Sequence, residues 1–125
     1  LLDHNLSHTW MLWPFGWARY GDWPDLAACR APLPLLVQYE LEDDLFTEAG
    51  MRAADARLAA HYASVGRSEN YIGQFYPGPH KFDLDMQAAA FAWLSRHAGT
   101  FGFRMSYPVD NTQGFAYEPW HWCLE

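Results

Sequence analysis

An acidic run and an isolated histidine follow the two most strand-like segments of the sequence. The acids are residues 42–44, centred on Asp43, and they follow the apolar run 34–39; His80 follows the β-prone run 71–76. Because the carboxyl ends of parallel strands meet at one edge of a sheet, both side chains would face the same crevice. There the imidazole could take a proton from a nucleophile while the carboxylate fixes its tautomer. From spacing alone, a solvated acid and a structural loop histidine are the alternative.

The segments that would position these side chains alternate between strands and helices. Residues 34–39 form a short apolar run between prolines and acids, which is typical of a buried parallel strand. Apolar residues recur at helical spacing over 48–65 and again over 83–97. The run 71–76 ends at residues 77–79, Pro-Gly-Pro, which no regular element crosses. This order predicts an α/β fold with a small, partial parallel sheet and flanking helices.

The two ends of the chain differ from this central part. Residues 101–107 and 114–117 flank the turn-forming residues 108–111, so we predict a C-terminal β hairpin. Near the N-terminus, prolines and glycines interrupt a run of tryptophans, and we expect short helical turns with these rings in a core. The tryptophans are Trp10, Trp13, Trp17 and Trp23. His4 and His8 lack the glutamate of a His-Glu-x-x-His zinc motif, and we interpret them as structural.

Several motifs around the acid and the histidine occur together in one enzyme family. They are residues 19–25 (RYGDWPD), 34–39 (PLLVQY), 42–46 (EDDLF) and 75–82 (FYPGPHKF). With them, roughly residues 1–97 resemble the C-terminal half of α/β-hydrolases related to dienelactone hydrolases and acetyl xylan esterases. The resemblance implies that Asp43 is the acid and His80 the base of a Ser-Asp-His triad. The family's upstream Gly-x-Ser-x-Gly elbow is missing, and Ser64 is its nearest imitation. Ester hydrolysis should therefore be weak or absent.

A second resemblance rests on about the last thirty residues. Residues 118–122 (EPWHW), preceded by FGF and SYP segments, resemble the end of VanY-like zinc-dependent D-alanyl-D-alanine carboxypeptidases, which hydrolyse peptidoglycan. The resemblance implies that Glu118 is the general base and His121 a zinc ligand, and a carboxylate at this spacing can reach the water that zinc acidifies. The family's upstream His and Asp ligands are missing. His80 with Asp83 or Asp85 could replace them; the alternative is a polar pair of Glu118 and His121 in an aromatic hairpin.

Charge and composition exclude several classes of function. A net charge of −7 and a pI near 5.2 oppose binding to nucleic acid. No apolar run approaches the roughly 18 residues of a membrane span, and residues 1–4 do not begin a signal peptide, so we expect a soluble cytoplasmic protein without a membrane partner. Cys29 and Cys123 are too few for a disulfide framework, and we expect Cys29 to be buried.

Three functions remain open at this point. We favour a carboxylic-ester hydrolase remnant over residues 1–97, without a cofactor, joined to a carboxypeptidase-like hairpin tail over residues 98–125. The first alternative is a zinc-dependent carboxypeptidase that acts on peptidoglycan outside the cytoplasm. The second is a non-enzymatic interaction module that self-associates through an open sheet edge. The substrate would be a small ester or a peptidoglycan-like peptide.

Overall fold

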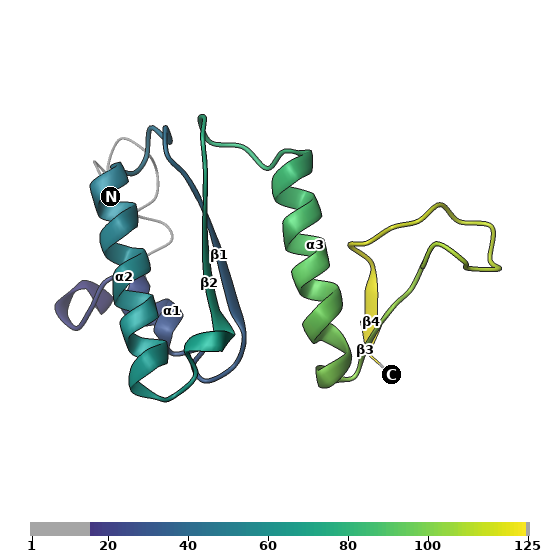
Figure 1. The fold of residues 1–125 in the computed structure, drawn as a ribbon, viewed down its shortest axis with the longest axis horizontal. Coiled ribbons are helices and arrows are strands. Elements are labelled where there is room, and N and C mark those ends of the chain that lie inside the picture. Colours follow the sequence, from purple (N-terminus) through teal and green to yellow (C-terminus); the bar gives the residue numbers. More distant parts are fainter. Residues whose placement is uncertain (1–15, 125) are drawn as a thin grey trace. The chain divides into compact units, whose positions relative to one another are not determined.

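The structure is a computed structural model that describes residues 16–124 (Figure 1). The chain divides into two compact units, Leu1–Lys81 and Phe82–Glu125. The boundary predicted above, between residues 1–97 and 98–125, separates two family resemblances rather than two packed units, and it stays a prediction. Four of the residues considered above lie outside the described part of the chain. They are His4, His8, Trp10 and Trp13.

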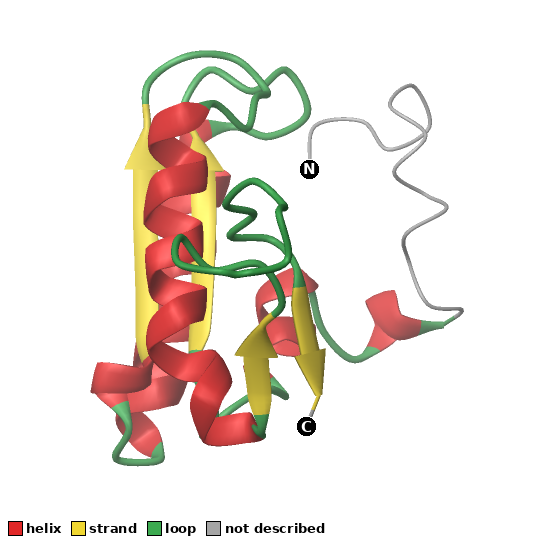
Figure 2. Ribbon diagram, turned by 90° about the vertical axis from the view of Figure 1, so that its right-hand side faces the viewer, coloured by secondary structure: helices red, strands yellow, loops and turns green. Residues whose placement is uncertain are grey.

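The first unit is built around a β-α-β segment. β1 (Leu35–Glu40) and β2 (Tyr71–Tyr76) pair in parallel, in a register from Leu35 opposite Tyr71 to Glu40 opposite Tyr76. α2 (Glu48–Ser64) connects the strands and lies beside them (Figure 1). Both strands point the same way, so the loops that follow them leave from the same end of the sheet (Figure 2). The expected small α/β fold is confirmed.

The core of this unit forms where α2 meets the sheet. Met51, Leu58 and Tyr62 are one helical turn or two apart in α2, and all three are buried. The hydroxyl of Tyr62 donates a hydrogen bond to the Leu33 carbonyl oxygen at 2.7 Å, just before β1. Its ring stacks on Tyr71 of β2, with the ring centroids 5.6 Å apart. One tyrosine therefore joins the helix to both strands.

A glycine lets a carboxylate of α2 approach the sheet. Tyr71 donates its hydroxyl proton to Asp55 Oδ1 at 2.7 Å, and the Tyr39 and Tyr71 hydroxyl oxygens lie 3.2 Å apart. A Cβ atom on Gly73 would stand 1.8 Å from Asp55 Oδ1, so any other residue there would displace the Asp55 carboxylate. Burial, followed by these hydrogen bonds, raises the pKa of Tyr71. The hydroxyl therefore stays protonated and continues to donate to Asp55.

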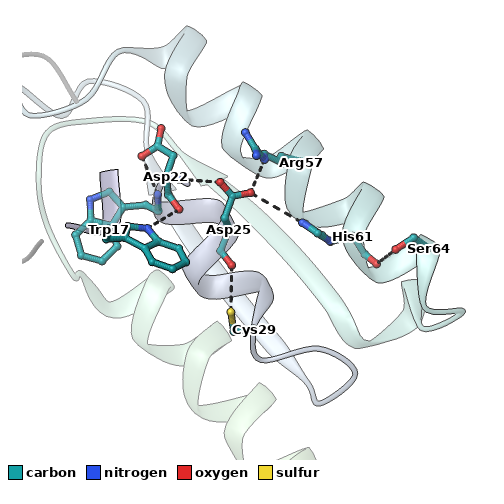
Figure 3. A network of polar contacts seen from close by, with 8 residues as sticks. Trp17, Asp22, Asp25, Cys29, Arg57, His61 and Ser64 are labelled. Carbon is teal, nitrogen blue, oxygen red and sulfur yellow. Dashed lines mark hydrogen bonds and ion pairs between the residues drawn. The ribbon is translucent and has the colours of Figure 1, made fainter. Parts of the chain in front are cut away.

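Figure 3 shows the polar contacts that join the short helix α1 (Trp23–Ala28) to α2. Asp22 caps α1, and the carboxylate of Asp25 reaches back to accept the Asp22 backbone N–H at 2.7 Å. The other Asp25 oxygen lies 2.6 Å from Arg57 Nε and 4.0 Å from His61 Nε2, both on α2. Cys29, at the end of α1, is exposed, so its expected burial was wrong. It lies past the last apolar residue of a six-residue helix, too short to carry it into the core.

Replacing Asp25 with alanine should lower the free energy of unfolding by about 1–2 kcal/mol. The substitution removes half of the capping box, whose loss has a cost in this range. It also removes the ion pair with the exposed Arg57, which adds little because water screens it. Urea unfolding followed by far-ultraviolet circular dichroism measures the change. Arg57→Ala, which leaves the cap intact, should cost less; an equal cost for both variants would contradict this explanation.

The second unit consists of a helix and a short antiparallel ladder. Asp83 caps the N-terminus of α3 (Leu84–Ala98), and its side chain accepts the Met86 backbone N–H at 3.1 Å. β3 (Phe103–Met105) and β4 (Trp122–Leu124) run in opposite directions, as the arrows of Figure 2 show. None of the described helices combines the length and the apolar character that crossing a membrane requires.

The expected strand pair is confirmed, but the second strand differs from the prediction. Residues 114–117 lie in the long loop between β3 and β4. The side-chain amide of Asn111 donates to the carbonyl oxygens of Pro108 and Phe115, at 2.8 and 2.9 Å, and Gly114 has a φ of +82°. These bonds fold the segment onto itself, so its backbone does not extend along β3.

Candidate functional site

The carboxyl end of the parallel sheet positions two loops against each other. The loop after β1 donates two backbone hydrogen bonds to the end of β2 and the loop that follows it. Leu41 N–H donates to the carbonyl oxygen of Tyr76, the last residue of β2, at 2.9 Å, and Glu42 N–H donates to the Gly78 carbonyl oxygen at 3.1 Å. Gly78 has a φ of +103°, a conformation that side-chain-bearing residues rarely adopt. This glycine turns the second loop back over the first, and His80 follows it.

Asp43 and His80 meet at this edge of the sheet. Asp43 Oδ2 lies 2.7 Å from His80 Nδ1, and Asp43 Oδ1 accepts the Leu45 backbone N–H at 2.7 Å. The Asp43 side chain is 3% exposed and that of His80 is 75% exposed, whereas neighbouring Asp44 is exposed. The buried carboxylate is thus held in place and orients an accessible imidazole. The structure brings this pair together; its catalytic role stays a prediction.

Asp43 should also change the titration of His80. Its hydrogen bond and its negative charge raise the pKa of the imidazole above the ordinary 6.5, with a further contribution from the charge of Glu40. This interaction therefore stabilises the folded protein fully below about pH 6.5, and the stabilisation is lost as the pH rises through the higher folded-state pKa. In metal-free protein, NMR titration should give a lower pKa for His80 in Asp43→Asn than in wild type. Asp44→Asn is the matched control, and an equal fall in both variants would contradict a specific pair.

Together with this pair, Glu40 forms a group of three side chains that could hold a metal ion. Glu40, Asp43 and His80 each offer one ligand atom, and these atoms lie within 4.8 Å of one another. The sequence did not indicate Glu40, because the predicted strand ends at residue 39, one residue before the observed end of β1. The signal available was its place at the carboxyl end of a parallel strand, beside the expected crevice.

Ser64 does not lie at this site. It is the last residue of α2, and its hydroxyl donates a hydrogen bond to the His61 carbonyl oxygen at 2.8 Å (Figure 3). The carboxyl end of the sheet lies at the start of α2, where the loop from β1 enters the helix, so the whole helix separates Ser64 from His80. Ser64 therefore cannot serve as a nucleophile for the pair of Asp43 and His80.

The C-terminal candidates form a second pair within the other unit. His121 Nδ1 and Glu118 Oε2 are joined by a hydrogen bond. Backbone hydrogen bonds hold both residues in place. The His121 N–H donates to the Glu118 carbonyl oxygen at 3.2 Å, and the Glu118 N–H donates to the Tyr107 carbonyl oxygen at 3.1 Å. The His121 ring also meets the Tyr107 ring edge-on, with centroids 5.5 Å apart. Asp85 lies in the first turn of α3, and its place as a ligand stays a prediction.

Comparison with known proteins tests the two resemblances. No curated protein and no solved structure matches the chain significantly. One family model does match, that of VanY, D-alanyl-D-alanine carboxypeptidase, over residues 38–124. The match includes Glu118 and His121, and it extends well upstream of the tail to β1. The α/β-hydrolase resemblance finds no support of its own in these comparisons. Because the match covers more than half of the sequence, the chain belongs to the VanY family of D-alanyl-D-alanine carboxypeptidases.

Proposed function

We propose that the protein is a zinc-dependent carboxypeptidase that removes the terminal D-alanine from the D-alanyl-D-alanine end of peptidoglycan stem peptides. The family match over residues 38–124 carries the proposal. The paired Glu118 and His121 support it, since the family's general base and one of its zinc ligands align with them by resemblance. Such a substrate would place the protein's work outside the cytoplasm.

The donor atoms near His121 fit only part of a zinc site. Among residues 82–124, no three His, Cys, Asp or Glu side chains bring their ligand atoms together as closely as the group at the sheet edge does. A hydrolytic zinc usually has three protein ligands and one open position. His121 would therefore need ligands from elsewhere in the protein. The group of Glu40, Asp43 and His80 is a separate set of three donors within the first unit and does not include His121.

In the proposed reaction Glu118 accepts a proton from water and then donates it to the leaving group. A zinc ion held in part by His121 would supply Lewis acidity to a water molecule and to the scissile carbonyl. Glu118 first releases the His121 imidazole, to which Oε2 is bonded in this structure, and then takes a proton from the attacking water. The water oxygen forms a bond to the carbonyl carbon as the C–N bond breaks. Glu118 passes its proton to the leaving amine, so the products are free D-alanine and a shortened peptide.

Release of D-alanine from a peptide ending in D-alanyl-D-alanine tests the proposal directly. We expect release by the purified full chain, its loss after treatment with a chelator, and its return when zinc is added back. A peptide ending in L-alanyl-L-alanine is the matched control and should not be cut. Release that a chelator does not affect would contradict the proposed role of zinc, and no release in the presence of zinc would contradict the carboxypeptidase.

A second candidate, weak ester hydrolysis, is favoured by the 2.7 Å contact between Asp43 and His80. Here the imidazole would take a proton from water directly, without a serine. Turnover of a small activated ester should then fall in His80→Ala and be insensitive to chelator. Unchanged turnover in that variant would remove this candidate.

The third candidate, an interaction module, is favoured by the sheet itself. Within the described residues, β1 and β2 pair only with each other, so each has an outer edge without a partner strand. Such edges can pair with another chain, and a second copy of this chain could supply the strand. Light scattering should then show dimers or larger species, whereas a stable monomer at high concentration would count against this candidate.

A further inference from the structure

We propose that Glu40, Asp43 and His80 bind a divalent transition metal ion, with zinc as the expected occupant, at the carboxyl end of the β1–β2 sheet. This site lies wholly within the first unit and contains neither Glu118 nor His121. The inference goes beyond the proposed carboxypeptidase activity, because it assigns a metal to residues that neither the family's motif nor the ester-hydrolase resemblance uses for that purpose.

The backbone places the three donors on one small surface. Glu40 is the last residue of β1, opposite Tyr76, and its carbonyl oxygen accepts the Asp43 backbone N–H at 3.2 Å. That turn brings the carboxylate at the end of β1 close to the carboxylate of Asp43 in the following loop. His80 arrives from the other loop, which is held to the first by the bond from Glu42 N–H to the Gly78 oxygen. The donors therefore come from two segments that the sheet itself keeps adjacent.

The donor atoms need little movement to surround an ion. They lie within 4.8 Å of one another, and a tetrahedral ion with bonds of about 2 Å holds its ligand atoms about 3.3 Å apart. Asp43 is already fixed, since Oδ1 accepts the Leu45 N–H and Oδ2 points to the imidazole. The exposed ring of His80 and the long side chain of Glu40 can make the remaining adjustment. A ligand that is itself hydrogen-bonded in this way is typical of metal sites.

The chemistry of the donors selects the class of ion. An imidazole nitrogen suits zinc and other transition metals, whereas calcium and magnesium favour sites made of oxygen alone. Two carboxylates neutralise the charge of a divalent cation. Three protein ligands leave a fourth position of a tetrahedral ion for water, which is the arrangement of hydrolytic rather than structural zinc.

Equilibrium dialysis of the purified full chain against zinc tests the site without an activity assay. We expect His80→Ala and Glu40→Gln each to bind one zinc ion fewer per chain than wild type, because the affinity of this site should be at least about tenfold weaker in both variants. Asp44→Asn, an exposed acid beside the site, is the matched control and should bind as wild type does. Circular dichroism of each variant checks that the fold is intact; His80 is exposed, so its loss should not disturb packing.

His121→Ala separates this inference from the proposed carboxypeptidase. If zinc binding depends on Glu40 and His80 but not on His121, the site is where we place it, whatever the protein hydrolyses. If zinc binding is lost in His121→Ala and kept in His80→Ala, our site is wrong, while the carboxypeptidase proposal stands. If wild type binds no zinc, or if Glu40→Gln and His80→Ala bind zinc as well as wild type does, the inference is likewise overturned.

Discussion

Replacing Glu118 with glutamine is expected to slow the release of D-alanine by about 10²- to 10⁴-fold, the usual contribution of a general base. Glutamine keeps the size of the side chain and can still hydrogen-bond to His121, but it cannot accept a proton from water. The lost interaction belongs to the transition state, so kcat and kcat/KM should fall together while KM changes little. Steady-state rates on a peptide ending in D-alanyl-D-alanine measure this.

Asp110→Asn is the matched control for this experiment. Asp110 is an exposed acid in the same long loop, and no catalytic or binding role falls to it. The variant should turn over at the wild-type rate. Zinc content should be equal in all three proteins, because glutamine at position 118 removes a proton acceptor rather than a metal ligand. A Glu118→Gln protein that keeps more than a tenth of the wild-type rate would show that Glu118 is not the base.

Replacing Tyr62 with alanine is expected to lower the free energy of unfolding by about 3–5 kcal/mol, as for other large aromatic residues cut back to alanine in a core. Tyr62 is fully buried, at 0% exposure, and its ring and hydroxyl join α2 to both strands. Typical domains are stable by about 5–15 kcal/mol, so the loss removes a large share of the total. Urea unfolding monitored by circular dichroism at the helix band measures it.

Two control variants divide this effect into its parts. Tyr62→Phe keeps the ring but leaves the Leu33 carbonyl without its donor, so it should cost about 1–3 kcal/mol. Tyr20→Ala removes the same side chain from a position that is 84% exposed and should change stability by less than about 0.5 kcal/mol. An equal effect of Tyr62→Ala and Tyr20→Ala would mean that the packing described here does not hold the unit together.

Local pattern was enough to predict most of the fold. The bounds of β2 follow from its β-prone residues and the Pro-Gly-Pro that ends it, and α2 follows from the spacing of Met51, Leu58 and Tyr62. β4 was missed because its three residues are too few to show an alternating pattern. Its pairing with β3 also depends on contacts across a long loop, and such contacts leave no periodic trace in the sequence.

The sequence predicted only those parts of the candidate site that follow from the position of the sheet edge. The rule that parallel strands end at a common edge predicted that Asp43 and His80 lie close together. In the structure Asp43 Oδ2 lies 2.7 Å from His80 Nδ1. The same rule did not indicate Glu40, because the strand was expected to end one residue earlier. A role for Asp85 depends on long-range placement, which spacing in the sequence does not encode.

The ladder of β3 and β4 has a consequence for the order in which the protein opens. Three residue pairs close the segment 106–121, and closing a loop of that length opposes the ladder by about 2.5 kcal/mol of chain entropy. The strand ends should therefore fray well before α3 melts, and Glu118 and His121 would separate in the same event. Hydrogen–deuterium exchange should show it: the Ser106 amide, bonded to the His121 oxygen, should exchange faster than the amides in the middle of α3. Equal protection of both would mean that ladder and helix open as one cooperative piece.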